Sequence, residues 1–338
     1  LEKSTGRTVH LDDLSVCFSG DIQLNGLNIG APGSIHDPWL QARRVQIDVS
    51  PFSLFLGRFE PSYVEVDGGQ LRVLRRANGS LELADLVDSA RATGRAASSG
   101  HEHKSRSPLQ MKLTHFRVLL VDEPTNSRIA LDEIEGEGNC DGQGVFQSNL
   151  SGMMNQGAFD LTTNYDVTGD KPILEGQFRA NDVVLDEGMD GLRYLIPILA
   201  GDGPSTQGRL STNVYLRGQG DSKPTILRSL TGHGQIVLDP IELRDSAFLK
   251  QLARISDEAA AGHVGSIRSE FLIKNERIST ERANVTLGKL PFALVGWTDF
   301  GGNLDYQVKL DGLNGRLTEK ASRWLTNLDV DLKALTTL

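Results

Sequence analysis

Long stretches of this sequence alternate apolar with polar residues, the pattern of a β-strand that has one dry and one hydrated face. The longest strict alternation runs from Phe159 to Thr168, and the segment Leu304–Leu310 repeats it. The run before that segment, Phe292–Trp297, is apolar on both faces, and the Gly301-Gly302 pair between them predicts a hairpin. Because the dry face of such strands has to be covered, the alternation constrains the fold more than any other feature.

The first 88 residues predict an amino-terminal β module. Apolar and polar residues alternate cleanly over Val45–Val49, and two further strand patterns occupy Tyr63–Val66 and Leu71–Leu74. Asp67-Gly68-Gly69 lies between those two patterns and predicts a hairpin turn.

Prolines interrupt the strand patterns of this module at two places. Pro38 breaks the stretch that precedes the strand at Val45–Val49. Ser50-Pro51 has the residue types of a helix start, and Leu54–Leu56 before Gly57 predicts a helix of one or two turns.

Residues 89–108 differ in composition from the rest of the chain. They are rich in Ala, Ser, Gly and Arg and predict a flexible linker or a long surface loop. His101 and His103 within this segment lack the further ligands that fix a metal. Residues 109–338 return to strand patterns, with amphipathic helices near 186–200 and 245–256. The predicted domains are therefore the module 1–88, the linker 89–108 and a β-rich region 109–338.

Charge and cysteine content exclude several classes of protein. The net charge of -9 argues against nucleic-acid binding, which draws its affinity from Lys and Arg placed against phosphates. Cys17 and Cys140 are too few for a disulfide scaffold, and a disulfide between them and two free thiols both remain open. The chain begins at Leu1 without an initiator Met, which predicts that an upstream segment precedes it.

The sequence shows no catalytic motif. It has no phosphate-binding loop, no strand-linked dinucleotide fingerprint, no nucleophile elbow and no zinc-peptidase motif. Carboxylate pairs such as Asp12-Asp13 and Asp186-Glu187 have the character of solvated turns or helix starts. The sequence therefore predicts a non-enzymatic protein with no cofactor and no metal site. A hydrolase would require carboxylates from different segments to converge in one pocket.

Two sets of patterns in this chain occur in a recognisable order and together cover most of it. In the carboxy-terminal half, three consecutive strand patterns occupy Phe271–Ile278, Phe292–Gly296 and Leu304–Leu310. The amino-terminal set consists of Ser4-Thr5-Gly6-Arg7, Val9, Leu11, Leu24, Leu27, Ile29, Ala42, Val45, Ile47, Val49, Leu54–Arg58, Val64–Asp67, Leu71–Val73, Asn78-Gly79 and Leu83. The amino-terminal set resembles the amino-terminal module of AsmA-like proteins, and the carboxy-terminal set is similar to another characteristic part of that family.

This resemblance implies a place and a function. AsmA-like proteins are anchored in the inner membrane by an amino-terminal helix, which here would end before Leu1, and they project into the periplasm. They resemble bridge-like lipid transfer proteins and are implicated in phospholipid transport between the inner and outer membranes and in outer-membrane assembly. The expected partners are phospholipid or another acyl-chain lipid, the inner membrane, and a partner at the outer membrane.

Pattern and resemblance together predict a mainly β protein with a few short helices, in which an extended, curved antiparallel sheet forms an open groove. An apolar lining suits this role, because each acyl methylene removed from water is worth about 0.8 kcal/mol. The alternative is a closed β-sandwich, a structural or protein-interaction module of the cell envelope whose dry faces pack on each other. The residues predicted to bind lipid are Val45, Ile47, Val49, Val64, Val66, Leu71, Val73, Phe159, Leu161, Tyr165, Leu304, Tyr306 and Val308.

Overall fold

The computed structural model describes residues 7–30, 38–77, 107–123, 127–185, 206–243, 264–288, 290–300 and 304–310. Over these ranges the chain is mainly β, as predicted, with two short helices, α2 (Pro51–Phe55) and α4 (Lys223–Ser229). The strands are β1 (Val9–His10), β2 (Asp13–Val16), β3 (Asp21–Gly30), β4 (Pro38–Val49), β5 (Pro61–Arg75), β6 (Leu109–Asp122), β7 (Ser127–Cys140), β8 (Val145–Met154), β9 (Gly157–Asp166), β10 (Ile173–Leu185), β11 (Thr206–Gln219), β12 (Thr231–Leu243), β13 (Val264–Lys274), β14 (Arg277–Leu287), β15 (Leu290–Asp299) and β16 (Leu304–Leu310).

The chain divides into two compact units. Unit 1 consists of Leu1–Met154 and Asp160–Asp170, and unit 2 of Asn155–Phe159 and Lys171–Leu338. Strand β9 therefore gives its first residues to unit 2 and the remainder to unit 1. The domain limits expected from the sequence, at residues 88 and 108, stay a prediction.

In unit 1 the strands follow one another in the sheet in the order β1-β3-β4-β5-β6-β7-β8, and β2 pairs with β3 beside β1. All of these pairs are antiparallel except β5 and β6, which run parallel, with Tyr63 opposite Gln110 and Leu71 opposite Val118. Parallel neighbours cannot be joined by a tight turn. The chain between β5 and β6, which holds the predicted linker, therefore provides a crossover connection; residues 78–106 of it lie outside the described ranges.

The hairpin predicted at Asp67-Gly68-Gly69 is wrong, because β5 runs through these residues as one strand. Both halves of β5 pair with β4 in one register, with Val45 opposite Val66 and Leu40 opposite Leu71. Gly68 has a φ of +64°, a conformation that glycine adopts readily. The glycine pair therefore marks a local irregularity inside a continuous strand, with no change of register against β4, rather than a reversal. Pro38 likewise begins β4 instead of breaking the chain before it.

Helix α2 confirms the start predicted at Ser50-Pro51. Ser50 is the N-cap residue and Pro51 occupies the first turn, although the Ser50 side chain makes no capping hydrogen bond. The helices predicted near 186–200 and 245–256 lie outside the described residues. Among the residues that the structure describes, no helix has the length and apolar character needed to cross a bilayer.

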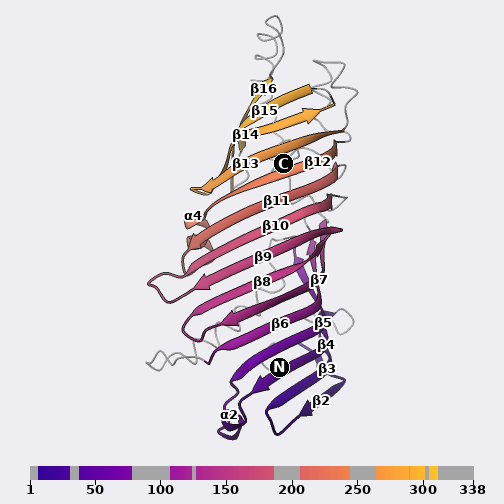
Figure 1. The fold of residues 1–338 in the computed structure, drawn as a ribbon, viewed down its shortest axis with the longest axis vertical. Coiled ribbons are helices and arrows are strands. Elements are labelled where there is room, and N and C mark those ends of the chain that lie inside the picture. The colour runs from indigo at the N-terminus through magenta and orange to yellow at the C-terminus, as the bar shows by residue number, and fades with distance from the viewer. Residues whose placement is uncertain are drawn as a thin grey trace, which may run out of the picture. The chain divides into compact units, whose positions relative to one another are not determined.

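In unit 2 the strands β10 to β16 pair in chain order, and all pairs are antiparallel. The predicted hairpin is confirmed, since β15 and β16 pair with Phe292 opposite Leu310 and Thr298 opposite Leu304. Helix α4 lies at the connection between β11 and β12 and contacts β11 (Figure 1).

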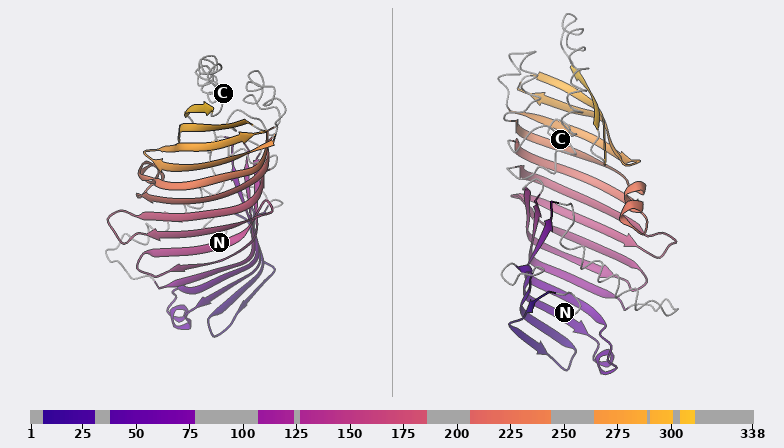
Figure 2. Two further views of the ribbon diagram at one scale, coloured as in Figure 1. Left: turned by 45° about the horizontal axis from the view of Figure 1, so that its top comes forward. Right: turned by 180° about the vertical axis from the view of Figure 1, so that it is seen from behind.

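Each unit consists of a single curved layer of strands, as Figures 1 and 2 show. Among the described elements, the main contacts of each strand are with its neighbours in the sheet. A β-sandwich requires two sheets stacked face to face. The predicted open sheet is thus confirmed, and no second strand layer covers it in these ranges.

Candidate functional site

One face of β3, β4 and β5 carries an apolar cluster, which we call the unit 1 cluster. Its residues come from positions that stand opposite one another across the strands, so their side chains share a face. The buried members are Leu27, Ile29, Trp39, Ala42 and Val45, and the partly buried members packed against them are Val9, Leu11, Leu24, Leu40, Ile47, Val64, Val66 and Leu71.

Five of the residues predicted to bind lipid belong to this cluster, namely Val45, Ile47, Val64, Val66 and Leu71. The register places Val45 opposite Val66 and Ile47 opposite Val64. The structure therefore brings these five side chains together on one face. Their contact with lipid stays a prediction.

Two other predicted residues continue the same face at its margins. Val49 is the last residue of β4 and is only 3% exposed. Val73 is half-buried on β5 and stands opposite Leu120 of β6. The apolar face thus extends from β3 across to β6.

The apolar positions of unit 1 change phase part-way along the strands. On β4 they fall at Leu40 and Ala42 before Arg43, and at Val45 and Ile47 after it. The neighbouring strand β5 shifts at the same level, where Gly68 has a positive φ. Because both strands shift together, their register is kept and the dry side stays on one face.

In unit 1, much of this face is covered only in part. Ile47, Val64, Val66, Leu71 and Val73 are all half-buried rather than sealed. Since no second layer of strands packs on the face in the described ranges, these side chains keep apolar surface that a ligand can cover.

In unit 2, the corresponding face is buried within the protein. Val183, Leu238, Ile241 and Leu287 are 0% exposed. Phe159, a predicted lipid-binding residue, is 4% exposed, and its ring centroid lies 6.3 Å from that of Phe178. A lipid tail at these residues would have to displace existing packing, so this part of the face is not an open groove.

Polar groups interrupt the apolar face of unit 1 at β8 and β9. Leu161 and Tyr165, both predicted to bind lipid, are half-buried on β9. Between them, Thr163 forms a hydroxyl–hydroxyl hydrogen bond of 2.7 Å with Ser148 of β8. The apolar lining is therefore weaker here than over β3 to β6.

The last three predicted residues lie on β16 of unit 2. Leu304, Tyr306 and Val308 stand opposite Thr298, Gly296 and Leu294 of β15. These positions continue the alternation expected from the sequence, and their role in lipid binding stays a prediction.

The other face of unit 1 is charged and is organised around Asp67. Arg43 Nη2 donates to Asp67 Oδ2 at 2.6 Å, Thr114 Oγ1 donates to Oδ1 at 3.1 Å, and His115 Nδ1 lies 3.1 Å from Oδ1. The guanidinium of Arg44 is 3.6 Å away. The hydrogen bond from Arg43, followed by that from His115, lowers the pKa of Asp67 from 3.8 to about 2.

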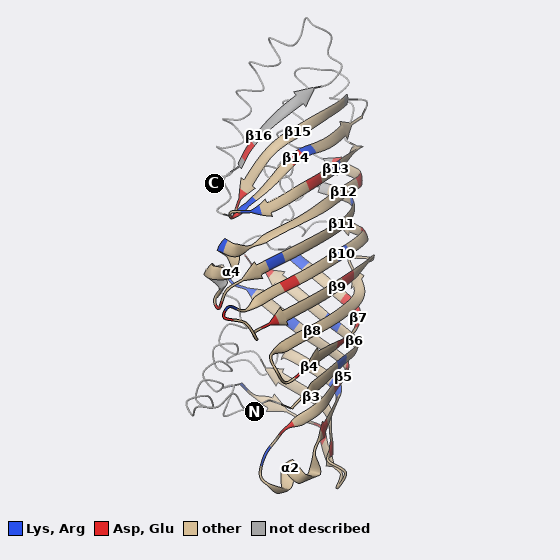
Figure 3. Ribbon diagram, turned by 60° about the vertical axis from the view of Figure 1, so that its left-hand side comes forward, with Lys and Arg blue, Asp and Glu red and all other residues tan. Residues whose placement is uncertain are grey.

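Further ion pairs cover the hydrated sides of both units, whose charged residues are coloured in Figure 3. In unit 1, Lys112 lies 3.6 Å from Glu65, and Arg117 lies 2.7 Å from Asp132. In unit 2, Arg217 Nη1 lies 2.9 Å from Glu175 Oε1. Each unit is therefore amphipathic through the thickness of its sheet.

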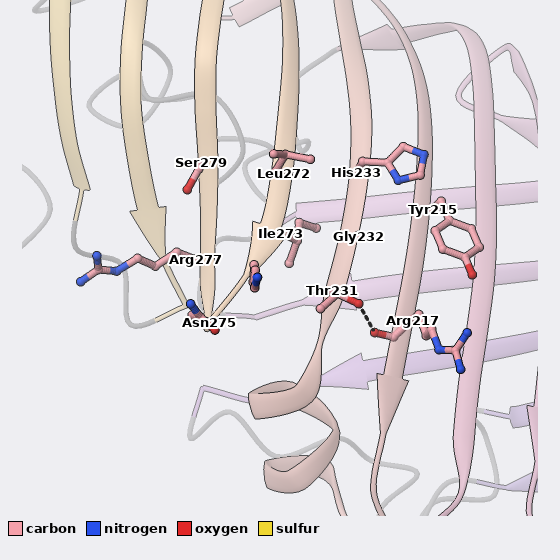
Figure 4. A pocket seen from close by; sticks show the side chains of 11 residues that line it. Tyr215, Arg217, Thr231, Gly232, His233, Leu272, Ile273, Asn275, Arg277 and Ser279 are labelled. Atoms are coloured by element: carbon pink, nitrogen blue, oxygen red, sulfur yellow. Dashed lines mark hydrogen bonds between the residues drawn. The ribbon is translucent and has the colours of Figure 1, made fainter.

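A hollow of about 820 Å³ lies on the hydrated side of unit 2, over β11 to β14. Figure 4 shows Tyr215, Arg217, His233 and Arg277 around it. Arg217 is held by Glu175, and the guanidinium of Arg277 lies 4.1 Å from the ring centroid of Trp297. The lining carries the cationic side chains of Arg217, Lys274 and Arg277 and is open to solvent, which does not suit an acyl chain.

Side chains that could ligate a metal do not gather in the described part of the chain. No three His, Cys, Asp or Glu side chains come together there as a metal site. Cys17 and Cys140 are both free thiols. His101 and His103, which the sequence analysis considered as metal ligands, lie outside the described residues.

Some residues of the cluster were not predicted from the sequence. Trp39, Leu40 and Ala42 lie in a stretch that Pro38 had marked as broken. The indole Nε1 of Trp39 is buried and has no hydrogen-bond partner among the described residues. The sequence signal that was missed is the phase shift at Arg43. Because of this shift, the apolar residues of β4 before Arg43 and those after it lie on the same face.

Comparisons of the chain with protein-family models, with curated proteins and with solved structures found no match. The resemblance to AsmA-like proteins therefore stays a prediction from the sequence. The functional argument depends on the chemistry of the two faces.

Proposed function

We propose that this chain is a non-enzymatic periplasmic protein that carries phospholipid between the inner and outer membranes, holding acyl chains on the apolar face of unit 1. The observation that carries the proposal is the half-buried apolar face of β3 to β6, which no second strand layer covers in the described ranges. A lipid tail would supply the missing cover.

The shape of the face supports a mobile ligand. Cross-strand apolar pairs such as Val45 with Val66 and Ile47 with Val64 repeat along the sheet, so neighbouring positions offer similar surfaces. A methylene chain gains about 0.8 kcal/mol for each buried CH₂ at any of them. Binding can then be firm while sliding between equivalent positions has a low barrier.

The burial of the unit 2 face limits the proposal. Residues such as Leu238 and Ile241 are fully buried, so unit 2 is proposed as a packed scaffold and unit 1 as the lipid-binding part. The predicted contacts at Phe159, Leu304, Tyr306 and Val308 are outside this restricted site.

The decisive experiment compares two variants of β4, each of which places a carboxylate on a different face of the sheet. Ile47→Asp puts a carboxylate on the half-buried dry face, whereas Gln46→Asp puts one on the hydrated face at the neighbouring position. We expect Ile47→Asp to lose at least about tenfold in affinity for a fluorescent phospholipid, because an ionised group among acyl methylenes is costly. Gln46→Asp should bind as the wild type does. Copurified lipid, identified by mass spectrometry, gives a second readout.

Stability has to be measured on the same variants by urea denaturation. Loss of lipid from a still-folded Ile47→Asp protein supports the proposal. Equal lipid binding by Ile47→Asp and the wild type contradicts it. If Ile47→Asp unfolds, the milder Val66→Thr variant replaces it, and unchanged binding there would show that the face is a structural core.

A further inference from the structure

Five large apolar side chains protrude from one end of unit 1, and we call them the aromatic tip. They are Phe18 at 106% exposure, Phe52 at 72%, Phe55 at 88%, Leu56 at 53% and Phe59 at 59%. Single exposed apolar residues are common on soluble proteins, but four phenylalanines at one end of a sheet are not. Such a concentration marks a surface with a partner.

Backbone contacts bring the two parts of the aromatic tip together. Phe18 lies in the turn between β2 and β3, and the other four residues lie on α2 and the turn after it. The amide of Val49 donates to the carbonyl of Gly20 at 3.1 Å, which ties the turn to the start of α2. Gly20 has a φ of +96°, and a Cβ there would lie 1.9 Å from the carbonyl oxygen of Val49. Figure 1 shows α2 and the end of β2 at the same edge of unit 1.

The segment from Ser50 to Phe59 satisfies much of its own backbone. The amides of Leu54, Leu56 and Gly57 donate to the carbonyls of Ser50, Phe52 and Leu54 at 3.1, 3.2 and 2.9 Å, and Arg58 donates to Ser53 at 2.8 Å. A segment can leave water only when its backbone polar groups are paired. This closed turn can therefore enter an apolar medium at little cost in hydrogen bonds.

Charge around the aromatic tip does not select the sign of the partner's charge. Residues 50–59 contain one base, Arg58, and no acid, but the carboxylates Asp21, Asp48 and Glu60 flank the two segments. Asp21 and Glu60 accept hydrogen bonds from Ser19 at 2.6 Å and from Ser53 at 3.3 Å. The partner is therefore identified by the exposed apolar side chains, which are of the kind found on segments that lie at the boundary of headgroups and acyl chains.

We propose that the aromatic tip inserts into the surface of a phospholipid bilayer and so docks unit 1 on a membrane. The side chains stand out singly into solvent, which suits a deformable lipid surface better than a fitted protein pocket. This inference rests on the proposed function for the choice of lipid as partner, since a lipid carrier needs contact with the bilayer that supplies its cargo.

The test is flotation of the full chain with vesicles of phosphatidylcholine and phosphatidylglycerol. We expect the wild type to float with the vesicles and Phe52→Ser/Phe55→Ser to lose at least about tenfold in partitioning, because two large apolar side chains no longer leave water. The matched control is Val264→Ser/Leu272→Ser, which removes exposed apolar side chains from unit 2 at 53% and 49% exposure. The control should float as the wild type does.

A second variant reports insertion directly. Phe55→Trp should show a blue-shifted emission with vesicles and quenching by lipids brominated near the headgroup. Absence of wild-type flotation, equal loss in the control pair, or an unshifted Phe55→Trp spectrum would each overturn the proposal.

Lipid content distinguishes this inference from the proposed function. If Phe52→Ser/Phe55→Ser floats normally while Ile47→Asp loses bound lipid, the docking inference fails and the proposed function stands. If the tip variant loses flotation and Ile47→Asp binds lipid normally, the proposed function fails and membrane docking stands by itself.

Discussion

Asp67 carries a carboxylate that is largely buried within the sheet of unit 1. Its side chain is 12% exposed, yet it has donors from Arg43, Thr114 and His115. Because β4, β5 and β6 each contribute a residue, the carboxylate links three strands next to Gly68, which has a positive φ. A buried charge is tolerated only when partners compensate it.

Replacing this carboxylate should destabilise unit 1. We expect Asp67→Asn to lower the free energy of unfolding by about 1–3 kcal/mol, because Arg43 loses its ionic partner and an amide cannot satisfy all the donors. Urea denaturation measures the change. The matched control, Asp132→Asn, removes the exposed ion pair with Arg117 and should change stability by less than about 0.5 kcal/mol.

The same residue predicts a pH dependence. The folded-state pKa of Asp67 is about 2, below the ordinary value of 3.8. Its stabilisation, about 2 kcal/mol, is therefore fully present above about pH 5 and is lost as the pH falls towards 2. The stability difference between the wild type and Asp67→Asn should shrink over that interval. A difference that stays constant from pH 7 to pH 2 would show that ionisation of Asp67 does not contribute.

At the scale of elements, the strand positions that share a face were predictable because alternation is a local property. Val45 and Val66 are recognisable as dry-face residues from their own neighbours in sequence. The irregularity at Gly68 was not recognised, because a glycine with positive φ can form a hairpin turn or lie within a continuous strand. Only the simultaneous phase shift on β4 distinguishes the two, and it depends on which strands pair.

Close packing of β5 against β6 gives an element-scale prediction. A Cβ at Gly69 would lie 2.2 Å from the ring of Phe116, a residue that is only 7% exposed. We expect Gly69→Ala to destabilise the protein by about 1–3 kcal/mol, since the ring has to move within packed surroundings. Thermal unfolding followed by circular dichroism measures the loss.

Gly138 provides the control for this substitution. It is also a strand glycine of unit 1, but a Cβ there would meet the flexible end of Met111 at 3.2 Å. Gly138→Ala should therefore cost clearly less than Gly69→Ala. Similar losses in the two variants would mean that the contact with Phe116 is not what requires a glycine.

At the scale of the molecule, the two units have the same alternation of apolar and polar residues but differ in how far the apolar face is buried. The half-buried face of β3 to β6 and the sealed face of unit 2 have similar sequence patterns, so the difference in burial could not be predicted from spacing. Alternation shows which side chains share a face, but it does not show how much of that face the fold covers. The parallel pairing of β5 and β6 was likewise not predictable from alternation, which does not specify strand direction.

A ligand that binds only the folded protein raises its stability. We expect a soluble short-chain phospholipid at 100 times its Kd to stabilise the wild type by about 2.7 kcal/mol, which raises Tm. The Ile47→Asp variant should show little or no rise at the same concentration. Equal rises in both proteins would place the lipid elsewhere than on the unit 1 cluster.

The parallel junction between β5 and β6 also sets a minimum length for the chain that joins them. β5 ends at Arg75 beside Asp122, the last residue of β6, whereas β6 begins at Leu109. With 14 residues in β6, the two ends that must be joined are separated by about 45 Å, at roughly 3.3 Å per residue. Even a fully extended tether needs about thirteen residues to cross that width. This geometry constrains the length of the connection and not its composition. Deletions within residues 89–108 should therefore be tolerated only while about thirteen residues remain to join β5 to β6.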